Sequence, residues 1–208
     1  RASAVFPDGL RFTTISFDGV TAIWNATDCE LVRLLTVPGR PSALGILAGG
    51  DAVAVTSNVG TTVWCSATGA MRQRLADPAM VVFPSAWNIR VFPDGRRVLT
   101  MSVAEAVIWD TESEFAQHRF ARWPRPIDAI AIAQSGDVVV TCGGGYTTVW
   151  NAESGEREGT SRNPRPHGSS IRRRGCLVQF ALVLALDPQG YGRGLPLGEL
   201  ASFRGRMQ

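Results

Sequence analysis

The sequence contains no lysine and only two histidines, which excludes several kinds of site. A chain without lysine has no P-loop lysine and no lysine Schiff base, and two histidines are too few for a histidine-rich metal site. No stretch approaches the roughly 20 apolar residues of a membrane helix, so we expect no membrane partner. The four cysteines are widely spaced, with no Cys-x-x-Cys pair. We therefore expect reduced thiols and a cytoplasmic location, with the nucleus as the alternative.

The 208 residues are 45% hydrophobic and 19% charged, which argues against disorder and is enough for a buried core. Charge is uneven along the chain: residues 1–155 hold 12 Arg and 14 acidic residues, whereas residues 156–208 hold 9 Arg and 4 acidic residues. The chain also begins at Arg1 and not at Met, and we expect it to be part of a longer protein. We predict a repeat-containing segment over 1–157, followed by a basic, Pro/Gly-rich linker with a short apolar segment over 158–208.

Four similar segments each end in a tryptophan, and the tryptophans are 40, 45 and 41 residues apart. The last four residues of these segments are Thr-Ala-Ile-Trp24, Thr-Thr-Val-Trp64, Ala-Val-Ile-Trp109 and Thr-Thr-Val-Trp150. A turn glycine precedes each tryptophan by 14 or 15 residues, and a small residue precedes it by seven or eight. Because chance does not keep four such registers, we interpret the segments as four copies of one structural unit.

Each unit is typical of short strands separated by tight turns. In the third unit we predict strands over 89–92, 97–102, 106–109 and 115–120, with a turn at Asp94-Gly95, where glycine accepts a positive φ. Apolar runs such as Val53-Ala-Val55 are typical of strands that are buried on both faces. A sheet of about 40 residues cannot cover both of its faces alone, so we expect the units to stack against one another as the sheets of a β-propeller do.

These segments resemble the WD40-repeat family over about residues 1–157. The resemblance lies in Phe92-Pro-Asp-Gly95, in Val107-Ile-Trp109-Asp110 and in the Ser154-Gly155 turn. It implies an all-β fold of about four four-stranded β-propeller blades in an incomplete or poorly closed ring. It also implies that four tryptophans form the structural core of the repeats: Trp24, Trp64, Trp109 and Trp150. The family's Gly-His dipeptide is missing from every unit, so we expect packing to hold the blades together more than the polar network built on that histidine.

The remaining residues, 158–208, lose the repeat pattern, and we expect an irregular tail. The basic run Arg172-Arg173-Arg174 has two interpretations, a solvated linker or a weak contact with nucleic acid. The apolar run Cys176–Leu186 is too short to span a bilayer and is interpreted as a buried strand or helix, or as the start of a decayed fifth blade.

No motif for catalysis stands out: we find no nucleophile elbow, no Gly-x-Gly-x-x-Gly before a helix and no paired carboxylates. We expect no enzyme activity, no cofactor and no metal, and predict a scaffold for protein or peptide partners. Candidate partner-binding residues lie in the connections between units, where Trp and Arg are typical of interface hot spots. They are Arg40, Trp87, Arg122, Trp123 and Arg125. The alternatives are a nucleic-acid-associated protein, or the non-catalytic propeller domain of a larger multidomain enzyme or signalling protein.

Overall fold

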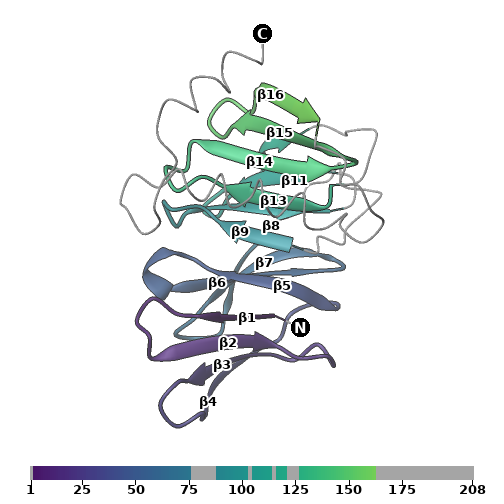
Figure 1. The fold of residues 1–208 in the computed structure, drawn as a ribbon. Helices are drawn as coiled ribbons and strands as arrows, with labels where there is room; N and C mark the ends of the chain where they lie inside the picture. The colour runs from purple at the N-terminus through teal and green to yellow at the C-terminus, as the bar shows by residue number, and fades with distance from the viewer. Residues whose placement is uncertain (1, 76–87, 103–104, 114–115, 121–126, 163–208) are drawn as a thin grey trace. The chain divides into compact units, whose positions relative to one another are not determined.

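The structure, a computed structural model, describes residues 2–75, 88–102, 105–113, 116–120 and 127–162. These residues form four antiparallel sheets of four strands each, joined in chain order, and they contain no α-helix (Figure 1). This confirms the predicted all-β class and the predicted number of four-stranded sheets. The chain divides into two units after Trp123, with sheets 1–3 in the first unit and sheet 4 in the second.

The sheets are built from strands of four to six residues. Sheet 1 contains β1 (Ala2–Val5), β2 (Arg11–Ile15), β3 (Thr21–Asn25) and β4 (Leu31–Leu35). Sheet 2 contains β5 (Pro41–Ile46), β6 (Ala52–Ser57), β7 (Gly60–Cys65) and β8 (Met71–Leu75), with a short 3₁₀ turn, η1 (Ala48–Gly50), before β6. Sheet 3 contains β9 (Asn88–Val91), β10 (Arg97–Met101), β11 (Ala106–Asp110) and β12 (Ala116–Phe120). Sheet 4 contains β13 (Ala129–Ile132), β14 (Val138–Gly143), β15 (Tyr146–Asn151) and β16 (Arg157–Arg162), so it extends past residue 157.

The Phe-Pro-Asp-Gly turn is stabilised by an arginine that follows two residues after the glycine. In sheet 1 the Asp8 carboxylate accepts the N–H groups of Leu10 and Arg11, at 2.9 and 3.2 Å, and the Nε of Arg11 at 2.9 Å. The Arg11 guanidinium also lies 4.4 Å from the centre of the Phe6 ring. Gly9 has φ of 69°, a value that a side chain disfavours.

The same turn recurs in sheet 3. The Asp94 carboxylate accepts the Nε of Arg97 at 2.6 Å, and the Arg97 guanidinium lies 4.4 Å from the centre of the Phe92 ring. The sequence pattern Phe-Pro-Asp-Gly-x-Arg therefore encodes a complete local unit, with a turn, an ion pair and a cation–π contact.

All four sheets share one register. The tryptophan in the third strand always faces the second residue of the second strand. A β-bulge always interrupts its pairing with the fourth strand. The cross-strand partners of the tryptophans are Phe12, Val53, Val98 and Val139, in chain order. The four units are thus copies in three dimensions as well as in sequence.

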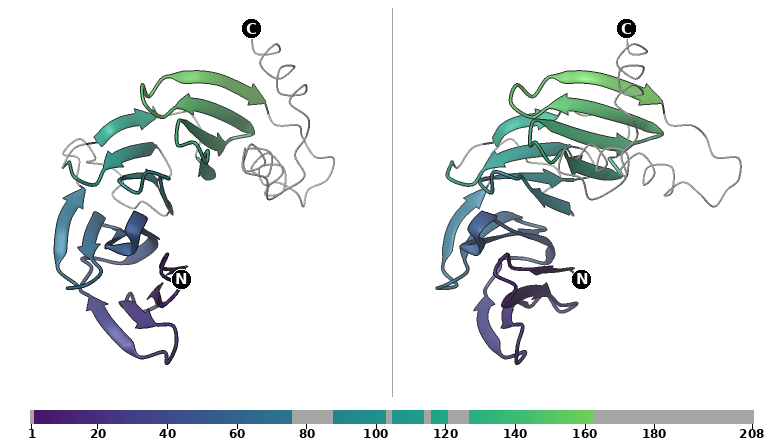
Figure 2. Two further views of the ribbon diagram at one scale, coloured as in Figure 1. Left: turned by 90° about the vertical axis from the view of Figure 1, so that its left-hand side faces the viewer. Right: turned by 60° about the vertical axis from the view of Figure 1, so that its left-hand side comes forward.

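The sheets of the first unit pack face to face. We call the side of each sheet that carries its tryptophan the tryptophan face, and the other side the opposite face. Ile15, Ile23 and Leu35, on the opposite face of sheet 1, pack against Val53 and Trp64, on the tryptophan face of sheet 2. The first strands of neighbouring sheets, β1, β5 and β9, lie next to one another (Figure 2).

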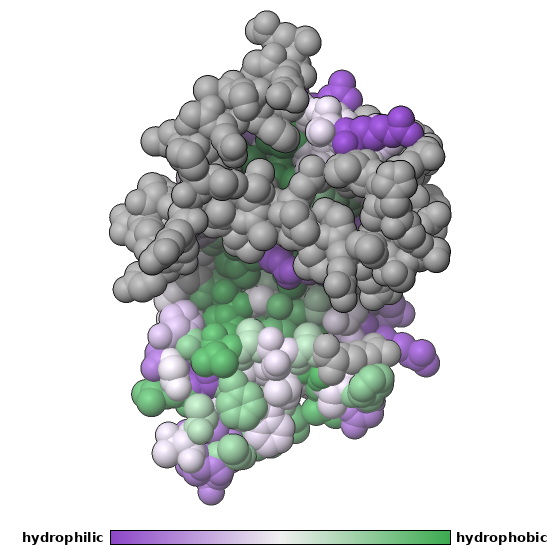
Figure 3. Space-filling view, viewed as in Figure 1, coloured by the Kyte–Doolittle hydropathy of each residue, from purple (hydrophilic) through white to green (hydrophobic). Residues whose placement is uncertain are grey.

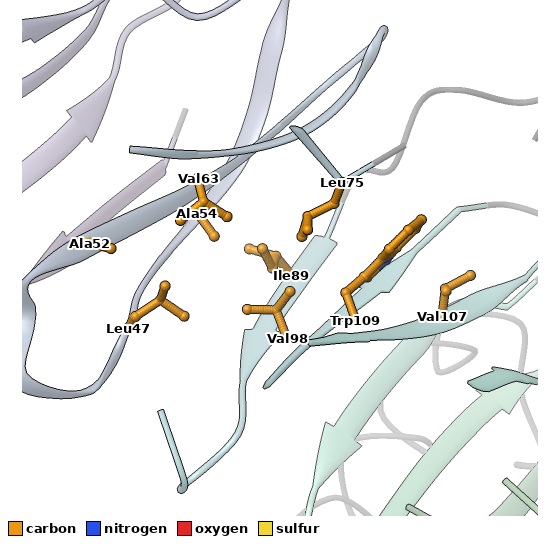
Figure 4. Close-up of a cluster of buried hydrophobic side chains, with 9 residues drawn as sticks. All are labelled: Leu47, Ala52, Ala54, Val63, Leu75, Ile89, Val98, Val107 and Trp109. Atoms are coloured by element: carbon orange, nitrogen blue, oxygen red, sulfur yellow. The ribbon is translucent and has the colours of Figure 1, made fainter. Parts of the chain in front are cut away.

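The contact repeats between sheets 2 and 3. Ala54, Val63 and Leu75, on the opposite face of sheet 2, pack against Val98 and Trp109, on the tryptophan face of sheet 3 (Figure 4). All six residues of β6 are buried, because one side of this strand packs on sheet 1 and the other on sheet 3. This confirms the prediction that Val53-Ala-Val55 is buried on both faces.

Each repeat tryptophan donates its indole N–H to a threonine hydroxyl. In three sheets the acceptor lies on the second strand, two residues after the tryptophan's cross-strand partner: Thr14 for Trp24 at 2.9 Å, Thr100 for Trp109 at 2.8 Å and Thr141 for Trp150 at 2.9 Å. The bond satisfies the polar edge of a ring whose body is largely buried between strands. A polar contact therefore accompanies the packing of the tryptophan.

In sheet 2 the tryptophan also bonds to a threonine, but this threonine lies on the third strand and a valine takes its place on the second. Val55 occupies the acceptor position on the second strand, and the hydroxyl of Thr62, its cross-strand partner, accepts the Trp64 N–H at 2.8 Å. In sheet 3 the same pair is reversed, with Thr100 facing Val107. One threonine at either position is sufficient for the bond.

This exchange generates a stability prediction. Thr100→Val should lower the free energy of unfolding by about 1–3 kcal/mol, because it leaves the buried N–H of Trp109 without an acceptor. Adding Val107→Thr should restore most of that loss, because it reproduces the arrangement of sheet 2. Chemical denaturation of the two single variants and the double variant measures the coupling. A double variant as unstable as the sum of the single variants would contradict the prediction.

Candidate functional site

Three connections meet at one end of sheets 1 and 2. They are the β2–β3 turn (residues 16–20), the β4–β5 connection (residues 36–40) and the β6–β7 turn (residues 58–59), and we call them together the loop surface. Two hydrogen bonds between Arg40 and Asn58 hold two of these connections together. The Arg40 N–H donates to the Asn58 side-chain oxygen at 2.5 Å, and the Asn58 N–H donates to the Arg40 carbonyl at 3.3 Å. Residues 18 positions apart in the sequence thus meet where sheets 1 and 2 adjoin.

Close packing fixes the conformation of the loop surface. Gly39 has φ of 78° and lies so close to the side chains of Asn58 and Val59 that any Cβ there would collide with them. Gly19, in the β2–β3 turn, faces the ring of Pro41 at the start of β5. Because the connections are held in this way, little conformational entropy remains to be lost when a partner binds.

Large apolar side chains project from these fixed connections. Phe17 is 86% exposed, Val20 is 45% exposed and Val59 is 38% exposed. The Arg40 side chain is also exposed, and its guanidinium forms no hydrogen bond or ion pair with any residue that the structure describes. The loop surface therefore offers an aromatic ring, aliphatic groups and a planar cation to a partner.

Of the five partner-binding residues predicted from the sequence, the described part of the chain contains only Arg40, which lies on the loop surface. Trp87, Arg122, Trp123 and Arg125 lie outside the described residues, as does the basic run Arg172-Arg173-Arg174. The sequence analysis missed Phe17, Val20 and Val59. One signal was available for the first two: they flank an Asp-Gly turn, where an apolar side chain has no strand face on which to be buried.

An ion pair lies at the other end of sheet 3, at the position that follows the repeat tryptophan. The Asp110 carboxylate, in the position after Trp109, accepts the Nε and Nη2 of Arg96 at 2.9 and 2.6 Å. It also accepts the N–H of Glu112 at 2.9 Å. The hydrogen bond and charge of Arg96 hold the pKa of the nearly buried Asp110 below its usual value.

Asparagine and cysteine take the place of this aspartate in the other sheets. Asn25 and Asn151 accept the N–H two residues further on, at 2.8 and 2.9 Å. In sheet 2 the residue is Cys65, whose sulfur accepts hydrogen bonds from the hydroxyl and N–H of Thr68, from the N–H of Ala67 and from Arg72, whose Nη2 lies 3.6 Å away. These donors, Thr68 first, lower the pKa of the Cys65 thiol to about 6.

The described residues lack two kinds of feature. They contain no group of three or more His, Cys, Asp or Glu side chains placed to hold a metal ion. None of their helical segments is long and apolar enough to cross a membrane.

Comparison of the chain with models of protein families and with curated proteins finds no match.

The Asp110 ion pair predicts a pH-dependent stability difference. Asp110→Asn keeps the backbone hydrogen bond, as Asn25 does in sheet 1, and loses only the charge pair with the half-exposed Arg96. We expect a loss of about 0.5–1 kcal/mol in the free energy of unfolding at neutral pH. Because the folded-state pKa of Asp110 is lowered, its contribution is present above the ordinary value of 3.8 and disappears as the pH falls through the folded-state pKa. Urea denaturation at neutral and acidic pH measures the difference, and an equal gap at both would contradict the assignment.

The environment of Cys65 predicts an unusually acidic thiol. The rate of its alkylation by iodoacetamide should rise with pH around a midpoint near 6, because the thiolate is the nucleophile and forms above that pH. Thr68→Val and Arg72→Gln should each move the midpoint upward, the first by more. Peptide mass spectrometry distinguishes Cys65 from the exposed Cys29, which serves as the internal comparison. A midpoint above pH 8 in the unmodified chain would contradict the prediction.

Proposed function

We propose that the chain is a WD40-like, β-propeller-type protein that serves as a non-catalytic scaffold for protein or peptide partners. The architectural part is supported by one register, one β-bulge and one Trp–Thr bond repeated in four sheets. The face-to-face packing of sheets 1–3 supports it further, since sheets that are apolar on both sides must stack, and propellers stack such sheets radially.

The binding part rests on one observation, the exposure of Phe17 and Arg40 on connections that are held in place. A guanidinium pairs with carboxylates through a planar fork, and an exposed phenyl ring packs against aromatic, aliphatic or proline side chains. The chemistry of the loop surface therefore favours peptide segments that combine acidic and large apolar residues. No reactive side chain is needed for this role.

The experiment compares two double variants with the same kinds of substitution. Phe17→Ser/Arg40→Glu alters the loop surface. Leu10→Ser/Arg90→Glu removes an exposed apolar residue in the β1–β2 turn and reverses an exposed arginine in β9, both outside the loop surface. Because all four positions are exposed, both double variants should melt at the temperature of the wild type.

Binding is measured against immobilised peptides that alternate Asp or Glu with Phe, Leu or Pro. For peptides that the wild-type chain binds, the loop-surface variant should weaken the dissociation constant at least about tenfold, and the control variant should leave it unchanged. Absence of binding by the wild type to the whole set, or equal weakening by both variants, would contradict the proposal.

A further inference from the structure

A second arginine adjoins the loop surface. Arg74 belongs to β8, and its Nη2 donates to the carbonyl of Val59, in the β6–β7 turn, at 2.8 Å. The same turn holds Arg40, through the two hydrogen bonds that Asn58 makes with it. Two exposed arginines, one from the β4–β5 connection and one from β8, are therefore attached to a single two-residue turn.

Neither arginine is neutralised by an acidic side chain that the structure describes. The Arg74 guanidinium bonds to a neutral carbonyl, and the Arg40 guanidinium forms no hydrogen bond or ion pair with any described residue. The surrounding residues 36–41, 57–61 and 71–75 contain no Asp or Glu. Because one N–H already anchors the Arg74 guanidinium, its other donors can bind a carboxylate at a reduced cost in side-chain entropy.

Successive contacts place the groups of this surface in a definite order. Gly19, in the β2–β3 turn that carries Phe17, faces the ring of Pro41. Arg40, the neighbour of Pro41 along the chain, bonds to the β6–β7 turn, and that turn also accepts Arg74. The β4–β5 connection thus lies between the turn with the phenyl ring and the turn that holds the second arginine. The attachment points of Phe17, Arg40 and Arg74 therefore follow one another across the surface.

The charge along this order changes from negative to positive. Asp18 follows Phe17, and its carboxylate accepts the hydroxyl of Ser16 and the N–H of Val20. These bonds, that of Ser16 first, hold the pKa of Asp18 below its usual value, so this turn is negative at neutral pH. Hydrophobic and hydrophilic residues both reach the surface over sheets 1 and 2, in the lower part of Figure 3. An acidic ligand group is repelled from the turn with the phenyl ring and attracted to the two arginines.

We propose that the loop surface binds an extended peptide with two acidic side chains in succession, and with its apolar side chain beside the pair and not between the two acids. Phe17 contacts the apolar side chain, Arg40 pairs with the nearer acid and Arg74 pairs with the farther one. In an extended chain every second side chain points to the same side, roughly 7 Å apart, so the motif is apolar-x-acidic-x-acidic or its reverse. The inference rests on the proposed function and adds to it the number and the order of the groups.

Peptides of identical composition test the order. Phe-Ser-Asp-Ser-Asp and Asp-Ser-Asp-Ser-Phe carry the phenyl ring at one end, whereas Asp-Ser-Phe-Ser-Asp carries it between the acids. Each is placed between Gly-Ser flanks with both termini capped, so that only the order differs. Fluorescence anisotropy with the full chain should show that at least one end-Phe peptide binds about fivefold more tightly than the middle-Phe peptide, because only then do both carboxylates reach an arginine.

Arg74→Gln tests the second pairing. It should weaken binding of the better end-Phe peptide about fivefold, and should leave unchanged the binding of the same peptide with its outer Asp replaced by Asn. Arg33→Gln is the matched control: Arg33 is also exposed, in β4, and its Nε also donates to a backbone carbonyl, that of Ala67 at 3.0 Å. Ala67 lies in the β7–β8 turn, at the other end of sheet 2, so this variant should bind all peptides as the wild type does. Both variants should keep the melting temperature of the wild type.

The outcomes separate this inference from the proposed function. Equal affinity for the three isomers would overturn it, as would Arg74→Gln affecting the two-acid and one-acid peptides alike. In either case, weaker binding by Phe17→Ser/Arg40→Glu would leave the proposed function standing without it. Equal weakening by Arg33→Gln would show an effect of net charge and would overturn the role of Arg74. Absence of wild-type binding to every peptide would contradict the proposed function and this inference together.

Discussion

One tryptophan at the same register in every sheet is the constraint on which the fold depends. The indole lies beside a β-bulge in the fourth strand, donates its N–H to a threonine and, in sheets 2 and 3, packs against the sheet before it. The ring is too large to be covered by a single sheet, so it requires a neighbour. Its polar edge requires an acceptor within the same sheet, which fixes how the second and third strands pair.

Much of this arrangement could be predicted from the sequence, because the spacing from turn glycine to tryptophan is a local property. The repeat pattern predicted four four-stranded sheets, and it placed the ends of the strands of the third unit to within one residue. The acceptors of the indole bonds were missed for a physical reason. Thr14 and Thr62 stand at different distances from their tryptophans along the chain and become equivalent only when the strands are paired. No linear pattern contains that equivalence.

The candidate site was predicted in part for a similar reason. Arg40 was identified because it lies in a connection rich in Pro and Gly, and composition shows that directly. Phe17 and Val59 belong to turns within two different sheets, and they join Arg40 only because sheets 1 and 2 pack face to face. A surface assembled from neighbouring sheets depends on tertiary packing, which local sequence does not express.

The loop surface and the tryptophan face of sheet 1 differ in chemistry because strands and turns impose different rules. Along a strand, side chains alternate between faces, so the charged residues of β2 and β4, Arg11 and Arg33, are directed away from the tryptophan face of sheet 1. That face therefore carries no charged residue. Turns impose no such alternation, and the loop surface carries both a cation, Arg40, and a phenyl ring, Phe17. A mixed surface of that kind suits a peptide with acidic and apolar side chains.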